Sequence, residues 1–187
     1  MAQLKNLVFR QATTQDSKVI CEIHNSNARG ETAANQHGFL LEKTTEEEVV
    51  QNLNENIQYF VAVNSSNEIL GFVTVAKPKI SNIFLNQVIW QDDTYKPKIL
   101  SEHHLYIQKV ATKVDYMGKG IAQFMYKSLY EKFPNSVITA FIVSKPIFNE
   151  RSFRFHQQQG FQQIGTIQKE LFLDLRNYES VLMVKET

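Results

Sequence analysis

The sequence is poor in cysteine, proline and glycine. One cysteine, Cys21, stands in 187 residues, so the chain can form neither an internal disulfide nor a cysteine-based metal clip. We expect Cys21 to be a reduced core or helix residue, as suits a cytoplasmic protein. Seven glycines are about half the average share of roughly 7%. Few positions can therefore hold backbone conformations that only glycine tolerates.

Long apolar runs and a strong net charge are also absent. The longest strongly apolar stretch, residues 137–143, is far shorter than the ~18 residues that span a bilayer. Residues 1–16 lack an apolar run of signal-peptide length. The 20 Lys and Arg against 19 Asp and Glu give a net charge of +1, which argues against a nucleic-acid binder. We expect a cytoplasmic protein with neither a membrane nor a nucleic-acid partner.

Hydrophobic periodicity predicts the elements of the first half. A short strand over 7–10 precedes a first helix with apolar residues at helical spacing. Thr45 and Glu48 make a capping box, which predicts the start of a second helix. The β-rich runs 59–63 and 69–75 flank a turn-forming tetrapeptide, so they should pair as an antiparallel hairpin.

In the second half, strands and helices are expected to alternate. Residues 82–100 are too irregular for a regular element, and a long loop of this kind is often functional. The expected elements after it are a strand over 106–112, a helix over 118–133, a strand over 136–143, a short helix over 149–159 and strands over 161–168 and 181–184. This alternation argues for βαβ units packed on one sheet.

Two of the seven glycines, Gly118 and Gly120, stand where a predicted strand gives way to a helix. A helix N-terminus exposes free amides and a positive dipole end, and small residues let a phosphate approach. Known nucleotide motifs do not fit, because a P-loop needs Ser or Thr after Lys119 and a Rossmann fingerprint needs glycine at Gln123. The segment alone therefore indicates either a phosphate-bearing ligand or a plain turn into a helix.

A second polar segment follows the next predicted strand. Asn149, Ser152 and His156 lie at i, i+3 and i+7, which places them on one face of a helix. Gly160 and Phe161 follow this helix. A polar face beside an anion site suggests a second wall for the ligand.

Together the two segments resemble the Gcn5-related N-acetyltransferase (GNAT) superfamily. Its acetyl-CoA motif, Gln/Arg-x-x-Gly-x-Gly/Ala at a strand-to-helix turn, is matched by Met117-Gly118-Lys119-Gly120-Ile121-Ala122. Its later motif is matched by Asn149, Ser152, His156, Gly160 and Phe161. The resemblance implies an α/β (α+β) fold over residues 1–187 as a single domain, with one mixed sheet of roughly six to seven strands and about four helices.

The resemblance also implies how acetyl-CoA (coenzyme A) is bound as cosubstrate, without a metal. Backbone amides of the glycine turn would hold the pyrophosphate, and the preceding strand end would pair with the pantetheine arm. The Val110 amide would polarise the thioester carbonyl. Met117 departs from the usual Arg or Gln, and Lys119, Arg151 or Lys145 could compensate. The implied cofactor-binding residues are Val110, Ala111, Thr112, Met117, Gly118, Lys119, Gly120, Ile121, Ala122, Asn149 and Ser152.

Acetyl transfer to an amine needs a neutral nucleophile, a stabilised oxyanion and a proton for the departing thiolate. His156 stands where many family members carry a proton-donating Tyr, and the C-terminal end of the helix dipole should favour its imidazolium. The alternative is that His156 only packs against CoA or hydrogen-bonds to it. Glu102 or His104, just before the strand, could be the general base, unless the strand entrance is merely solvated or a water chain suffices.

We therefore expect an acetyl-CoA-dependent N-acetyltransferase that transfers the acetyl group directly to an amine of a small molecule or protein. Residues 25–39 and 82–100 are the expected walls of the acceptor site. The rival hypothesis is a non-catalytic CoA-binding sensor or interaction domain on the same fold. Either a monomer or a homodimer is expected.

Overall fold

The computed structural model describes residues 6–32, 38–55 and 57–187. The chain divides into two compact units. Unit 1 comprises Met1–Ala76 and Gln108–Lys132, and unit 2 comprises Lys77–Ile107 and Phe133–Thr187. The two units are described separately below, and the single domain over residues 1–187 stays a prediction.

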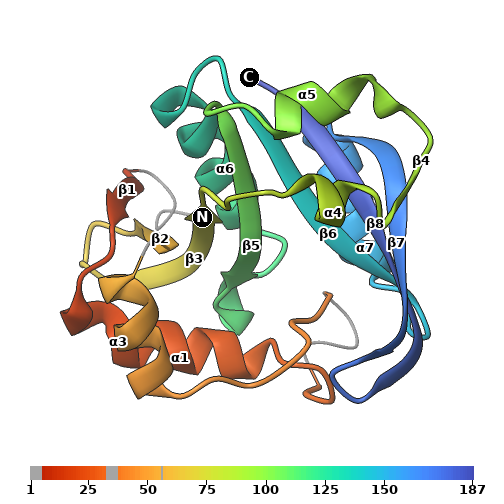
Figure 1. Ribbon diagram of the computed structural model, residues 1–187. Coiled ribbons are helices and arrows are strands. Elements are labelled where there is room, and N and C mark those ends of the chain that lie inside the picture. The colour runs from red at the N-terminus through yellow and green to blue at the C-terminus, as the bar shows by residue number, and fades with distance from the viewer. Residues whose placement is uncertain (1–5, 33–37, 56) are drawn as a thin grey trace. The chain divides into compact units, whose positions relative to one another are not determined.

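The described residues of unit 1 form an antiparallel set of strands with three α-helices (Figure 1). Strand β1 pairs antiparallel with β2, and β2 pairs antiparallel with β3. Helices α1 and α3 lie next to each other. The elements are β1 (Val8–Gln11), η2 (Thr14–Asp16), α1 (Ser17–Ser26), α3 (Glu46–Asn54), β2 (Ile57–Val63), β3 (Ile69–Ala76), the part of β5 (His104–Thr112) after Ile107, η4 (Val114–Tyr116) and α6 (Ile121–Lys132).

The local signals of unit 1 are confirmed. The amide of Glu48 donates to Thr45 Oγ1 at 3.2 Å, and the amide of Thr45 donates to Glu48 Oε2 at 3.0 Å, so the capping box starts α3 as predicted. The predicted hairpin is β2 and β3. In its turn, Asn64 Oδ1 accepts from the amides of Ser66 and Glu68, each at 3.0 Å, which satisfies donors that the strands leave free.

Gly71 marks the closest packing in unit 1. A Cβ atom on Gly71 would lie 2.8 Å from the backbone oxygen of Ala111 and 3.2 Å from Ile121 Cγ2. The absence of a side chain therefore lets β3 approach both the end of β5 and the start of α6. The close approach expected of a strand glycine thus occurs beside the glycine turn, and it sets the position of the strand that enters that turn.

Unit 2 combines one parallel and three antiparallel strand pairings. Strand β5 runs parallel to β6 from His104↔Val137 to Ile107↔Ala140. Strands β6 and β8, β8 and β7, and β7 and β4 pair antiparallel. The elements are α4 (Asn82–Leu85), β4 (Val88–Trp90), η3 (Asp93–Tyr95), α5 (Lys96–Ile99), the first part of β5, β6 (Val137–Lys145), α7 (Glu150–Gln158), β7 (Gln162–Phe172) and β8 (Leu175–Glu186).

The mixed α/β class is as predicted, but two details differ. The described residues contain eight strands in the hydrogen-bonding order β1-β2-β3-β5-β6-β8-β7-β4 and six α-helices, rather than six to seven strands and about four helices. Residues 82–100 are not one loop, because they hold α4, β4 and α5. Strand β4 has three residues, too few for periodicity to reveal. Its pairing with β7 depends on Gly165, where a Cβ would lie 2.9 Å from the oxygen of Ile89.

Candidate functional site

The glycine turn of unit 1 ends at the N-terminus of α6. Gly118 and Gly120 have φ of +72° and +82°, a region that costs other residues roughly 1–2 kcal/mol. A Cβ on either glycine would meet no atom within 4 Å. The amide of Phe124 donates to the oxygen of Gly120 at 2.9 Å, so the amides of Ile121 and Ala122 precede the first intrahelical bond. The turn thus presents backbone donors beside open space.

A carboxylate that the sequence analysis missed anchors this turn. Glu68 forms an ion pair with Lys113 and accepts a hydrogen bond from the Tyr116 hydroxyl at 3.1 Å. The amide of Lys113 donates to the oxygen of Leu70 at 2.8 Å. The Lys113 ammonium lowers the pKa of Glu68, so this carboxylate stays ionised. Its hydrogen bond from Asn64 Nδ2 at 3.0 Å is local. No local pattern reveals its role at the turn, because Lys113 and Tyr116 lie 45 and 48 residues away.

The side chains of the turn supply one exposed cation. Lys119 is exposed, and its Nζ lies 5.1 Å from the centre of the Tyr116 ring. Met117 is half-buried and offers no charge to a phosphate. Of the proposed substitutes for the missing Arg or Gln, Lys145 is paired with Glu179 at 3.0 Å, and Arg151 is exposed on α7. Lys119 is the cation that unit 1 places on the turn itself.

The end of β5 is held by a buried asparagine. Asn27 Nδ2 donates to the backbone oxygen of Thr112 at 3.1 Å and to that of Ile23 at 2.8 Å. Ala111 is buried, and Val110 and Thr112 are half-buried. The expected acceptor wall of residues 25–39 therefore begins with a structural contact to β5, and its residues 33–37 lie outside the described part of the chain.

Helix α7 of unit 2 carries the second motif on its covered face. Asn149 is its N-cap and is 8% exposed, His156 is 2% exposed, and Ser152 is half-buried. Arg151 and Arg154 are exposed. The predicted common face of Asn149, Ser152 and His156 is therefore the one turned toward the interior of the unit.

The structure corrects the expected charge of His156. Its Nδ1 lies 2.7 Å from the backbone oxygen of Ser152, and since a carbonyl oxygen only accepts, Nδ1 carries the proton. Burial lowers the pKa of His156 to about 4, so the ring is neutral at neutral pH. Desolvation of the charged form outweighs the helix dipole, which was expected to favour the imidazolium.

The two expected base candidates have opposite environments. His104 is 4% exposed, its Nε2 lies 2.7 Å from Thr139 Oγ1, and burial lowers its pKa to about 4. Glu102 is exposed in the turn before β5. Only Glu102 is in contact with solvent.

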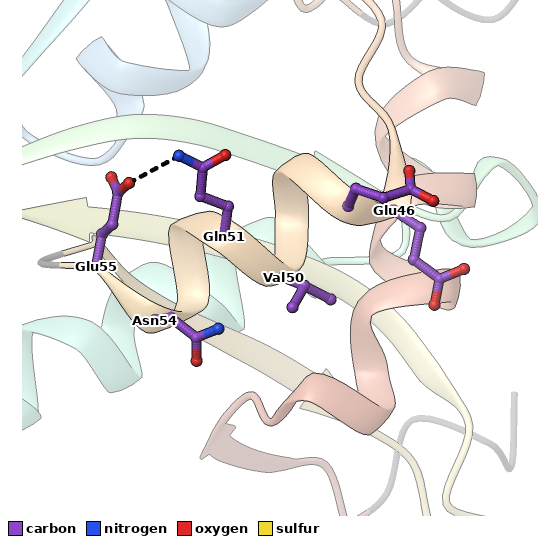
Figure 2. A pocket seen from close by; sticks show the side chains of 6 residues that line it. Glu46, Val50, Gln51, Asn54 and Glu55 are labelled. Atoms are coloured by element: carbon purple, nitrogen blue, oxygen red, sulfur yellow. Dashed lines mark hydrogen bonds between the residues drawn. The ribbon is translucent and has the colours of Figure 1, made fainter.

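A shallow hollow lies elsewhere, along the outer face of α3 (Figure 2). Figure 2 shows its side chains spaced along the helix, with Gln51 Nε2 donating to Glu55 Oε1 at 3.1 Å. The lining residues are Glu46, Glu47, Val50, Gln51, Asn54 and Glu55. Three carboxylates would repel a phosphate-bearing ligand, and none of the predicted site residues is among them.

Two further features are absent from residues 6–32, 38–55 and 57–187. Within them, no three His, Cys, Asp or Glu side chains are grouped as metal ligands would be. None of their helices combines the length and apolar composition needed to cross a bilayer.

Comparison with known proteins places both segments within one family match. The model of the acetyltransferase (GNAT) family matches residues 20–161, a range that includes the glycine turn and α7. No curated protein matches the sequence significantly.

Solved structures share the fold at low identity. An N-acetyltransferase from Staphylococcus aureus is 17% identical over 97% of this chain and 99% of that chain, with a TM-score of 0.65. A ribosomal-protein-alanine N-acetyltransferase from Brucella melitensis is 18% identical over 96% and 99%, with a TM-score of 0.66. A phosphinothricin acetyltransferase from Sinorhizobium meliloti, in complex with AcCoA, is 16% identical over 96% and 88%, with a TM-score of 0.62.

Proposed function

The chain belongs to the acetyltransferase (GNAT) family, and from this premise we propose that it is an N-acetyltransferase that moves the acetyl group of acetyl-CoA directly to an amine of a small molecule or protein. The observation that carries the proposal is the pair of positive-φ glycines at the start of α6. This pair places backbone donors beside open space at the positive end of a helix dipole. Both kinds of acceptor are kept because the relatives include enzymes named for a ribosomal protein and for phosphinothricin.

Unit 1 fits the phosphate and pantetheine parts of acetyl-CoA. In the proposal, the amides from Gly118 to Ala122 bind the pyrophosphate, and Lys119 adds a positive charge in place of the Arg or Gln that Met117 lacks. The backbone of Val110, Ala111 and Thr112 pairs with the pantetheine arm. The Val110 amide donates to the thioester oxygen as the tetrahedral intermediate forms. The relative solved with AcCoA supports the choice of cosubstrate, and no step uses a metal.

Unit 2 contributes proposed contacts between α7 and CoA. These contacts are tested separately from those of unit 1. Asn149 and Ser152 are proposed to contact CoA. Glu102 and His104 remain the proposed bases, and Glu102 is preferred because it is the exposed one. Of the two roles considered for His156, the neutral ring favours packing or hydrogen bonding against CoA. With the ring proton on Nδ1, Nε2 accepts a hydrogen bond and does not donate one.

The first experiment tests the glycine turn. We expect Gly120→Ala to weaken CoA binding at least about tenfold in calorimetry, because a Cβ at positive φ strains the turn that presents the amides. Gly30→Ala is the matched control, since Gly30 has φ of +94° and also meets no atom within 4 Å. The control should lose similar stability but keep its CoA affinity. Equal CoA affinity in the two variants contradicts the placement of the pyrophosphate.

A second experiment tests His156. In thiol-release assays, His156→Gln should raise the KM for acetyl-CoA and change kcat little, because the ring binds without donating a proton. A fall in kcat at unchanged KM, with loss of the alkaline limb of the pH profile, would instead assign the acid role to His156.

The rival function is a non-catalytic CoA-binding sensor, and Met117 is the feature that favours it. Thiol release from acetyl-CoA across a panel of amines distinguishes the two functions, with thermal stabilisation by CoA as the measure of binding. Thermal stabilisation by CoA, without thiol release from acetyl-CoA in the presence of any amine, identifies the sensor. The cytoplasmic location, the monomer or homodimer and the absence of a nucleic-acid partner stay predictions.

A further inference from the structure

Lys109 is a lysine whose ammonium has no ion-pair partner among the described residues. It lies on β5 directly before Val110 and is half-buried. Within the described residues, its ammonium makes no hydrogen bond or ion pair at contact distance. Lys113, four positions further along the same segment, forms an ion pair with Glu68. The two lysines therefore differ in whether an ion pair holds the amine in its protonated, unreactive form.

The carboxylates that attract Lys109 act through space, without an ion pair at contact distance among the described residues. Glu48 attracts it, but Glu48 Oε2 accepts from Thr44 Oγ1 at 2.8 Å and from the amide of Thr45 at 3.0 Å. Glu42 also attracts Lys109. Burial is the largest effect and lowers the pKa of Lys109. A larger fraction of neutral amine is the consequence.

We propose that Lys109 is an acetylation site of the protein itself, modified by the acetyl-CoA that its own glycine turn binds. This inference rests on the proposed function. The thioester oxygen is assigned to the amide of Val110, whose nitrogen is two bonds from the Cα of Lys109. The flexible four-carbon stem of lysine can bring Nζ to that edge of the strand. All the residues in this argument belong to unit 1.

The reaction is a balanced acyl transfer. Lys109 Nζ, after losing a proton to solvent, attacks the thioester carbonyl carbon with its lone pair. The carbon–sulfur bond then breaks, and its electron pair leaves with the CoA thiolate. The second proton lost from Nζ passes to the thiolate through solvent. The products are Nε-acetyl-Lys109 and CoA thiol, and no oxidant or further cofactor is needed.

Peptide mapping by mass spectrometry after incubation of the full chain with acetyl-CoA, without an added amine, tests this site. We expect Lys109 to gain one acetyl group at least about tenfold faster than Lys113, because ion pairing holds Lys113 in its protonated form. Lys109→Arg should lose the fast phase of thiol release seen without an amine. Modification of Lys113 or of exposed lysines as fast as that of Lys109 contradicts the proposal.

A short thioester separates guided transfer from chemical reactivity. S-acetyl-N-acetylcysteamine carries the acetyl group without the pyrophosphate, so Gly120→Ala should slow the acetylation of Lys109 by acetyl-CoA but not by this donor. Equal slowing with both donors contradicts a role for the turn. Release of CoA thiol in the presence of added amines, without acetylation of Lys109, overturns this inference alone. Absence of both CoA binding and thiol release overturns the proposed function and this inference together.

Discussion

Two histidines of unit 2 show how burial decides the charge of a side chain. His104 and His156 are 4% and 2% exposed, and each has one ring nitrogen at 2.7 Å from an oxygen. The position of His156 in the last turn of α7 predicted a cation. The loss of solvation is larger than the effect of the helix end, because a pKa lowered from 6.5 to about 4 corresponds to roughly 3 kcal/mol. The dipole contributes at most about 2 kcal/mol even to a partly buried group.

The same residues predict how stability depends on pH. Both histidines have a folded pKa of about 4 against an ordinary value of 6.5. Between these values the unfolded chain binds protons that the folded chain does not. The free energy of unfolding should therefore be highest above pH ~6.5 and fall toward pH ~4, by up to roughly 3 kcal/mol for each histidine.

Urea unfolding across this pH range checks that expectation. His104→Gln and His156→Gln should each show a flatter dependence on pH than the original chain, whatever their absolute stability. A variant whose pH dependence matches that of the original chain would show that the replaced histidine does not titrate as its burial indicates.

At the scale of elements, the contact of β3 with β5 and α6 sets the position of the glycine turn. The closest atom to a Cβ on Gly71 is a backbone oxygen at 2.8 Å, which cannot rotate away as a side chain can. Lys113 and Tyr116 then tie the following loop to Glu68, the residue directly before β3. The hairpin of β2 and β3 is thus the support of the candidate CoA site.

Gly71→Ala should destabilise the protein by roughly 1–3 kcal/mol through overpacking. Thr74→Val on the same strand is the control. Thr74 is fully buried, and within the described residues its Oγ1 has no hydrogen-bond partner, so an apolar replacement of similar shape should be neutral or stabilising. Thermal unfolding measures both variants. An unchanged melting temperature for Gly71→Ala would show that β3 can shift away from β5 at little cost.

At the scale of the whole molecule, a net charge of +1 provides little long-range attraction for an anionic cosubstrate. In the proposed function, affinity for CoA therefore comes from local groups, namely the α6 amides and Lys119 in unit 1 and the α7 contacts in unit 2. The two contributions can be measured separately because they lie in different segments of the chain.

Hydrogen exchange with saturating CoA should protect residues 110–122 of unit 1 and 149–156 of unit 2. ADP, which has the pyrophosphate but no pantetheine arm, should protect 118–122 and leave 110–112 unchanged. Protection of only one unit by CoA would show that the residues assigned in the other unit are not CoA contacts. This outcome would be independent of any effect on turnover.

The sequence by itself determined the capping box of Thr45 and Glu48, the β2–β3 hairpin, the glycine turn and the common face of α7. Each depends on residues that are neighbours in the chain, so the spacing of residue types suffices. Only the tertiary structure decided the eighth strand, the neutral state of His156, the anchoring of the turn by Glu68 and the lack of an ion-pair partner for Lys109 among the described residues. These depend on burial and on contacts between residues far apart in the sequence, and neither is contained in local spacing.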